Sequence, residues 1–422
     1  MSAFYDLLLA KKLSGGGSPG PGPSPSSDDW TRPSTWPDLD SLDLTDFEGV
    51  YLTYDLTEFG ADPHIALNVR TQDNADFNVD RGHISNGAFV VDESFTGQSH
   101  TSDSMTQRFR FNEALDPANG NVQLFRVTTT TSFLWIYFTG DDVHPGVDQP
   151  CVERYGRLSN VTKIDTWYNS GSYKTYQCYS WSTRWLQHDK VVGVGASNLI
   201  TTMDYTYSFS NSLEKVELDG WQMGGCALTT LGNAFSNCSM LKTVDMSAWD
   251  TSSWVLRNIS STFMYCANLR ELKWPSVVNL AAASFSTNNA FQFCGLKSVD
   301  FRGFTFDRIT QWTGNPFQQN ASFETILGLE NIPAAAILTN WNNCPNPSYC
   351  YGLKNYKGIH CAANYQTYSN NQALSAESLA AILANLEEPA GTGYNISLPT
   401  NQKARLTAAQ IAVATDKGWT VN

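Results

Sequence analysis

A repeated pattern in the second half of the chain limits the possible folds more than any other feature of the sequence. Its shared form is Phe, two residues, Cys, one or two residues, and then Leu-x-x-Val-x-Leu. Four copies and a weaker fifth follow one another, at residues 208–221, 234–249, 262–275, 290–304 and 316–329. Their anchor residues lie 28, 28, 27 and 27 positions apart, at Leu213, Leu241, Leu269, Leu296 and Phe323. A period of this length predicts a stack in which each copy adds one strand and one return segment.

Alternation within each copy separates a buried side of the expected strand from an exposed one. The apolar positions are predicted to stack into one core: Val216, Leu218, Val244, Met246, Leu272, Trp274, Val299 and Phe301. The positions between them form a candidate ligand-binding face: Lys215, Glu217, Asp219, Thr243, Asp245, Ser247, Glu271, Lys273, Ser298, Asp300 and Arg302. Its mixed charges and hydrogen-bonding groups suit a glycan or a protein, and a merely solvated face is the alternative.

Three cysteines, Cys238, Cys266 and Cys294, occupy the same position in successive copies, with Ser212 and Asn320 near that place in the first and fifth. Stacked copies set such residues in a line, one strand spacing apart, and a line of thiols does not surround a metal ion. We therefore expect buried free thiols, no metal site and no cofactor. Thiols of this kind are typical of a protein made in a reducing cytoplasm.

The segment 235–252 carries Phe-x-x-Cys-x-x-Leu-x-x-Val-x-Met-Ser-x-Trp-Asp-Thr-Ser, and it resembles the BspA-like leucine-rich repeats of bacterial surface proteins. The resemblance covers roughly residues 205–335. Trp221, Trp249 and Phe304 match the family's aromatic place after the strand, whereas Val277 departs from it. The family occurs on bacterial adhesins and, without signal peptides, on structural proteins of phages and prophages. The resemblance thus implies a leucine-rich-repeat solenoid that contacts other surfaces.

The remaining sequence predicts a mainly β chain with some α. Residues 47–170 contain alternating stretches separated by turn formers, at 50–56, 64–71, 88–95, 105–112 and 122–140, which is typical of a β-sandwich. The expected solenoid follows at 171–340. Residues 341–422 are expected to hold further repeats and an α/β cap, with helices at 374–386 and 407–419 and strands at 394–398 and the C-terminus.

The first residues read as a tether. Residues 1–13 predict a short amphipathic helix whose apolar stripe contains Phe4, Leu7 and Leu8. Residues 14–46 form a Gly/Pro/Ser spacer and an acidic lead-in, which we expect to be solvated because the calcium-loop spacing fails. The start FYDLLLAKKLSGGG is similar to the helix-plus-polyglycine beginning of many tail-fibre, head-fibre and baseplate-associated proteins of phages. The similarity implies an anchor in other virion proteins, and a frayed terminus is the alternative.

Charge and motifs exclude several functions. The net charge of -13 disfavours nucleic acid and anionic membranes as partners. The sequence has no run of 18 apolar residues, so it predicts no transmembrane helix. Asp6 interrupts the apolar stretch near the start, so the sequence predicts no signal peptide. No catalytic motif is present, so no catalytic residue is assigned. Asp141, Asp142, His144 and Asp148 are interpreted as a polar turn rather than as a cation site.

The combined prediction is a non-enzymatic virion protein, made in the host cytoplasm, that acts as a fibre or appendage. Its expected partners are other virion proteins and a host surface glycan or protein. Fibres are usually trimers, and a homotrimer stays open because no long heptad segment specifies one. A bacterial surface adhesin or interaction protein is the first alternative. A polysaccharide-degrading enzyme is the second, since a pair of carboxylates suffices for that chemistry.

Overall fold

The computed structural model describes residues 30–56, 64–71, 75–99, 107–110, 121–131, 133–137, 151–159, 186–196, 198, 200–336, 350–360, 365–368, 370–389 and 391–422. The chain divides into two compact units, Met1–Arg32 and Pro33–Asn422. The expected anchor helix, with Phe4, Leu7 and Leu8, lies outside the described residues. Of the residues that the structure describes, strands hold 31% and helices 11%, so the prediction of a mainly β fold is confirmed.

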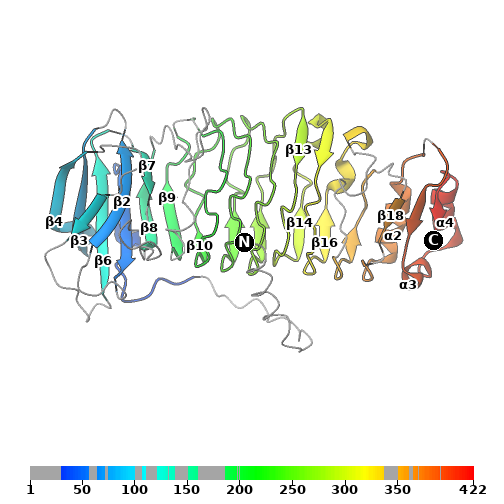
Figure 1. The fold of residues 1–422 in the computed structure, drawn as a ribbon, viewed down its shortest axis with the longest axis horizontal. Coiled ribbons are helices and arrows are strands. Elements are labelled where there is room, and N and C mark those ends of the chain that lie inside the picture. Colours follow the sequence, from blue (N-terminus) through cyan, green and yellow to red (C-terminus); the bar gives the residue numbers. More distant parts are fainter. Residues whose placement is uncertain are drawn as a thin grey trace. The chain divides into compact units, whose positions relative to one another are not determined.

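The second unit begins with two β-sheets (Figure 1). The larger sheet has the strand order β10-β9-β8-β1-β6-β3-β4. Its first five strands along the chain pair antiparallel: β1 (Gly49–Asp55), β3 (Phe77–Ser85), β4 (Ala88–Gln98), β6 (Val122–Thr129) and β8 (Cys151–Arg157). The smaller antiparallel sheet has the order β5-β2-β7, with β2 (His64–Thr71), β5 (Gln107–Arg110) and β7 (Phe133–Tyr137).

Alternation along β1 explains how the two sheets pack. Val50, Leu52 and Tyr54 are buried in the same core cluster as Ile65 and Leu67 of β2. Because successive side chains of a strand point to opposite faces, these residues of β1 share the face that meets the smaller sheet.

The opposite face of β1 carries Tyr51, and the acidic lead-in covers it. The 3-10 helix η1 (Leu39–Ser41) belongs to this lead-in. Leu39 is fully buried and Leu42 is almost fully buried, and both belong to one hydrophobic cluster with Tyr51. The expectation of a solvated lead-in was therefore wrong for its leucines, although the Asp38 carboxylate is exposed as expected. The many acidic residues made this segment look solvated, but its two leucines, spaced Leu-x-x-Leu, cover the apolar face of the sheet.

The larger sheet continues into the repeats without a break. Parallel pairing joins β8 to β9 (His188–Val192) and β9 to β10 (Lys215–Val216). The sheet thereby crosses the boundary expected between residues 47–170 and 171–340. One hydrophobic core cluster extends from Val50 to Val421.

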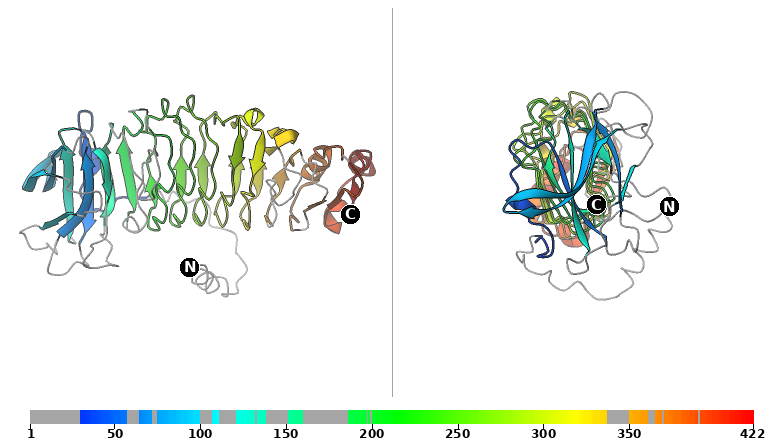
Figure 2. Two further views of the ribbon diagram at one scale, coloured as in Figure 1. Left: turned by 45° about the horizontal axis from the view of Figure 1, so that its top comes forward. Right: turned by 90° about the vertical axis from the view of Figure 1, so that its left-hand side faces the viewer.

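Each repeat forms one coil, meaning the chain from one anchor residue to the next. The coil strands are β11 (Thr243–Asp245), β12 (Glu271–Lys273), β14 (Ser298–Asp300), β16 (Thr325–Leu327) and β17 (Asn355–Tyr356). Val244 pairs with Leu272, Val299 with Ile326, and Ile326 with Tyr356, so the sequence period sets the register. Seen along the stack, successive coils overlie one another (Figure 2).

A second series of parallel bridges closes another wall of the coils. It links Thr202, Thr230, Asn258 and Ser286 in turn. The short strands β13 (Ser284–Ser286) and β15 (Gln311–Thr313) extend it. Three 3-10 helices lie in or after the later coils: η5 (Phe306–Arg308), η6 (Leu329–Asn331) and η7 (Ala334–Ala336).

The interior of the coils is a column of stacked aromatic rings. Tyr207, Phe235, Phe263, Phe291 and Phe317 stack with centroid separations of 5.3, 5.5, 5.7 and 5.9 Å. The thiols of Cys238 and Cys266 lie beside the column, and each Sγ contacts the backbone carbonyl of the preceding coil's ring residue at 3.0 Å. All three repeat cysteines are buried, as expected, and burial raises the pKa of Cys294 to about 12.

The register of the first copy needs a correction, whereas the fifth copy is as predicted. Leu213 donates its backbone N–H to Ser210 as Leu241 does to Cys238, so Ser210 and not Ser212 takes the cysteine place. Asn320 takes it in the fifth copy and donates to the Phe291 carbonyl at 2.8 Å. A small hydrogen-bonding side chain is thus the requirement at this position, and cysteine is one way to meet it.

The C-terminal residues complete the stack with helices on the return segments. β18 (Tyr365–Thr367), β19 (Asn395–Ser397) and β20 (Thr420–Val421) pair in parallel. The helices are α2 (Ala376–Ala384), α3 (Thr400–Lys403) and α4 (Ala408–Thr415). Ser375 caps α2, and Thr407 with Gln410 forms a capping box at the start of α4.

Candidate functional site

The predicted binding face lies on one side of the coils, as its alternation required. Its residues occupy β10, β11, β12 and β14 or the turns just after them, and the apolar residues between them point into the core. Parallel register brings Thr243 beside Glu271 and Asp245 beside Lys273. The sequence therefore placed this face correctly, and its role in binding stays a prediction.

Most charged side chains of this face form ion pairs with one another. Asp245 and Lys273 form an ion pair across one coil spacing, with Oδ2 and Nζ 2.9 Å apart. Arg302 holds Asp300 two residues away, with Nη2 and Oδ2 2.5 Å apart. Ser298 and Asp219 are exposed beside these pairs. Pairs of this kind contribute little to stability at an exposed surface, but they align the charged side chains in rows.

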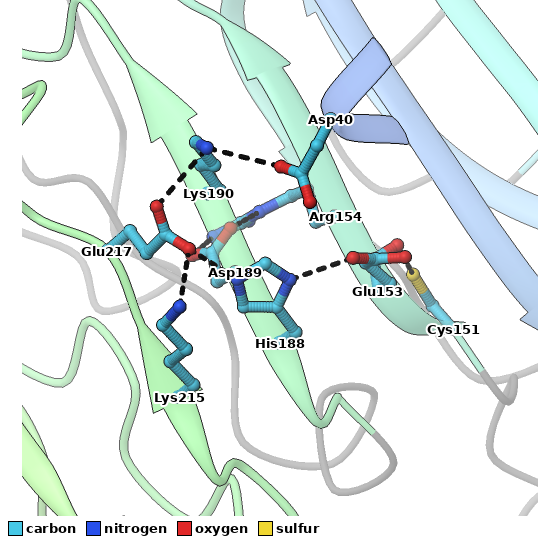
Figure 3. A network of polar contacts seen from close by, with 9 residues as sticks. All are labelled: Asp40, Cys151, Glu153, Arg154, His188, Asp189, Lys190, Lys215 and Glu217. Carbon is cyan, nitrogen blue, oxygen red and sulfur yellow. Dashed lines mark hydrogen bonds and ion pairs between the residues drawn. The ribbon is translucent and has the colours of Figure 1, made fainter. Parts of the chain in front are cut away.

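Two residues of the face, Lys215 and Glu217, belong to a polar network at the seam between the antiparallel sheet and the coils (Figure 3). Register explains how the network forms, because Glu153 of β8 lies opposite His188 of β9, which lies opposite Lys215 of β10. His188 Nδ1 lies 2.7 Å from Glu153 Oε1, and its Nε2 lies 3.1 Å from Glu217 Oε1. One imidazole thus bridges two carboxylates.

Two carboxylates flank the His188 ring, and one of them, Glu217, also pairs with Lys190 and Lys215 (Figure 3). Burial opposes the charged imidazolium, but the hydrogen bonds to Glu153 and Glu217 outweigh it, and the pKa of His188 is raised. The pKa of Glu217 is lowered, because bonds to His188 and Lys215 outweigh its own burial.

The other face of the same strands carries a second pair. Arg154 Nε donates to Asp189 Oδ1 at 2.7 Å, and a second bond joins Arg154 Nη2 to Asp189 Oδ2. The Tyr207 hydroxyl, on the first ring of the aromatic column, donates to Asp189 at 2.7 Å. Sequence reasoning missed Glu153, Arg154, His188 and Asp189. The one available signal was the presence of charged residues within predicted strands. The sequence did not show which of them pair, because the partners lie 35 residues apart.

The two groups at the centre of the seam network, His188 and Glu153, are buried. His188 is 1% exposed and Glu153 is fully buried, so neither side chain meets solvent. A general base must reach the proton that it abstracts, and these groups do not. Their arrangement instead satisfies buried charges at the point where an antiparallel sheet becomes a parallel one.

Because protonation of His188 strengthens the seam, its stabilising effect should fade at alkaline pH. A group with a raised folded pKa contributes its full effect below its unfolded pKa, about 6.5, and loses it as the pH rises through the folded value. The difference in unfolding free energy between the wild type and His188→Gln is expected to be largest near pH 6 and to shrink above it. Urea titrations across this range measure it.

A matched control is His83→Gln, which removes an exposed histidine that lies 3.0 Å from Asp92. This variant measures what the loss of a surface histidine alone does to the stability. A difference between wild type and His188→Gln that stays constant from pH 6 to high pH would contradict the charged imidazolium.

Metal and membrane features are absent from the residues that the structure describes. No group of three or more His, Cys, Asp or Glu side chains among them could hold a metal ion. None of their helices combines the length and apolarity that crossing a membrane requires. The acidic turn at residues 141–148 lies outside the described ranges. Comparison with protein families, curated proteins and solved structures finds no match for the chain.

Proposed function

We propose that this chain is a leucine-rich-repeat protein of a phage or prophage particle, a fibre or appendage that contacts a glycan or protein on the host surface. The observation that carries the proposal is the parallel register of the coils, which repeats one side-chain position at each coil spacing. Repeat stacks of this kind bind partners through extended surfaces. The proposal assigns no catalytic role, in keeping with the burial of His188, Glu153 and Asp189 at the seam.

The leucine-rich-repeat assignment is supported by what the repeat residues do. Leu241 and Leu269 are fully buried where each coil enters its strand, and Cys238 and Cys266 fill equivalent places behind them. Strand β8 of the larger sheet pairs in parallel with β9, so this edge of the first coil is paired and not open. A stack of repeats needs such a cap for solubility.

The proposed anchor is the helix at residues 1–13, whose Phe4, Leu7 and Leu8 would dock on another virion protein. The separation of Met1–Arg32 from the second unit supports this role, as does the Gly/Pro/Ser composition of residues 14–27. A lone amphipathic helix of this length is marginal in water, so it needs a partner surface.

Mass spectrometry of density-purified particles tests the location. The chain is expected in the particles at a fixed stoichiometry, and its copy number would indicate the symmetry of its position. Deleting residues 1–27, or changing Phe4, Leu7 and Leu8 together to serine, is expected to remove it from particles while the free protein stays folded. Finding the chain on cells and never in particles would overturn the virion role and favour an adhesin.

Binding of the purified full-length chain to host cells tests the attachment role. We expect saturable binding to the cells on which the particles grow and none to unrelated cells. Unchanged adsorption of particles that lack the chain, together with no binding by the purified protein, would leave only a decorative role.

A further inference from the structure

A second surface of the coils is built from aromatic, amide and hydroxyl side chains. In the segment ahead of each anchor leucine, residues adopt the left-handed backbone conformation with φ of 54–64°: Tyr205, Phe209, Asn233, Asn237, Ser261, Tyr265, Asn289, Phe293 and Gln319. Backbone hydrogen bonds join these segments coil to coil, as from Phe209 to Ser236 and from Asn237 to Met264. These nine residues therefore form rows, and together they are called the aromatic–amide wall.

The aromatic members of the wall occupy positions that do not favour them. Left-handed backbone suits Gly and Asn, and it disfavours bulky side chains. Asn237 and Gln319 fill the same coil position as Phe209, Tyr265 and Phe293, so the turn itself does not require a ring. Residues in strained conformations cluster at functional sites, where another role retains them.

The rings are available at the surface. Tyr205 is 46% exposed and Phe209 is 36% exposed. Tyr265 and Phe293 stack with centroids 5.1 Å apart and are half-buried. The inner column at Tyr207, Phe235 and Phe263 already fills the core, so the wall rings are additional to it.

The wall carries no charge. None of the residues in the described segments 205–212, 233–240, 261–268, 289–295 and 315–322 is acidic or basic. Amides and hydroxyls supply its polar groups, as where Asn237 Nδ2 donates to Ser236 Oγ at 3.0 Å and Gln292 Nε2 to Gln319 Oε1 at 2.9 Å. The strand face on the same coils is charged at nearly every outward position. Two surfaces of one stack thus differ completely in chemistry.

We infer that the aromatic–amide wall binds an uncharged glycan, which deepens the proposed host-binding role and rests on it. Aromatic rings pack against the apolar faces of sugar rings, and amides and hydroxyls exchange hydrogen bonds with sugar hydroxyls. A linear glycan repeats along its length, as the wall does. A folded protein partner offers no such repeat, and protein interfaces concentrate their binding energy in one central cluster rather than in repeating rows.

The chain offers its own conservative replacement for the test. Changing Phe209, Tyr265 and Phe293 together to asparagine copies what Asn237 already does at that coil position. Because Asn tolerates left-handed backbone better than an aromatic residue does, the triple variant is expected to keep or raise the melting temperature of the full-length protein. A matched control, Asp245→Asn with Lys273→Gln, removes an ion pair from the strand face instead.

The probe is surface polysaccharide extracted from the host cells and separated by anion exchange into neutral and acidic fractions. The wild type is expected to bind the neutral fraction, the triple variant to bind it at least about tenfold more weakly, and the strand-face control to stay within about twofold of wild type. Binding only to the acidic fraction, no binding to either fraction, or undiminished binding by a folded triple variant would overturn the inference. Equal loss in the strand-face control would also overturn it, by moving the site to the charged face.

Failure of the inference is distinguishable from failure of the proposed function. If the chain is present in particles and binds cells treated to remove glycans, the attachment role stands and a protein receptor replaces the glycan. If the neutral fraction binds but the chain is never found in particles, the glycan site stands and the virion role falls.

Discussion

Replacing Arg154 with methionine is expected to lower the free energy of unfolding by about 3–5 kcal/mol, because it leaves a buried carboxylate without its cation. Asp189 is 1% exposed, and the Tyr207 hydroxyl that donates to it would not replace the lost positive charge. The loss should appear as a lower urea midpoint of the full-length protein. Hydrogen exchange should locate it at β8 and β9.

Two further variants make this prediction specific. Arg154→Met with Asp189→Asn removes both charges while keeping an acceptor for Tyr207, and it is expected to recover most of the lost stability. Arg302→Leu breaks an exposed pair instead and is expected to leave the midpoint unchanged. If the double variant were as unstable as the single one, the buried charge would not be the cause.

Replacing Phe263 with alanine is expected to cost about 3–5 kcal/mol of unfolding free energy, since it empties the middle of the aromatic column. The ring is fully buried and stacks between Phe235 and Phe291, with centroids 5.5 and 5.7 Å away. Thermal denaturation followed by circular dichroism would measure the loss. Met240→Ala, at a side chain 41% exposed in the preceding coil, is the control and should change little. A loss below about 1 kcal/mol for Phe263→Ala would mean that the column collapses around the gap.

Much of the structure of the repeat region could be predicted from the sequence, because a local sequence pattern determines the structure of each coil. The spacing of the anchor leucines fixed which strands pair, and alternation fixed which side chains of Thr243–Asp245 and Glu271–Lys273 face outward. Local periodicity carries this information because a coil contacts its neighbours in order. The sequence did not establish whether the outward face binds a ligand. A charged surface whose side chains pair with one another has the same sequence pattern as a charged surface that binds a ligand.

The register of the first copy misled for a physical reason. Phe209 stands near the place of the repeat's Phe, but the ring in the column is Tyr207. Tyrosine is needed there because the hydroxyl must reach Asp189 at the seam. The deviation from the repeat is thus caused by a partner on β9, which no local pattern contains.

The seam and the lead-in were also beyond local patterns. The pairing of Glu153 with His188 and of Arg154 with Asp189 joins strands that are distant in the sequence. Leu39 and Leu42 are surrounded by aspartates in sequence and by Tyr51 and Tyr155 in space. The sequence analysis was based on the neighbouring aspartates, whereas the burial of the two leucines depends on the tyrosines that surround them in space.

The coil-to-coil register allows the length of the stack to change in whole repeats. Since each coil is bonded to the coil before and the coil after it, duplication or loss of one 27- or 28-residue copy leaves both ends of the stack with the neighbours they need. Such an event would move the C-terminal end by about one strand spacing, roughly 5 Å, and would add or remove one rung of every surface row. The length of the stack and the number of rungs in each surface row are therefore coupled, and recombination within the repeat can change both in a single genetic step.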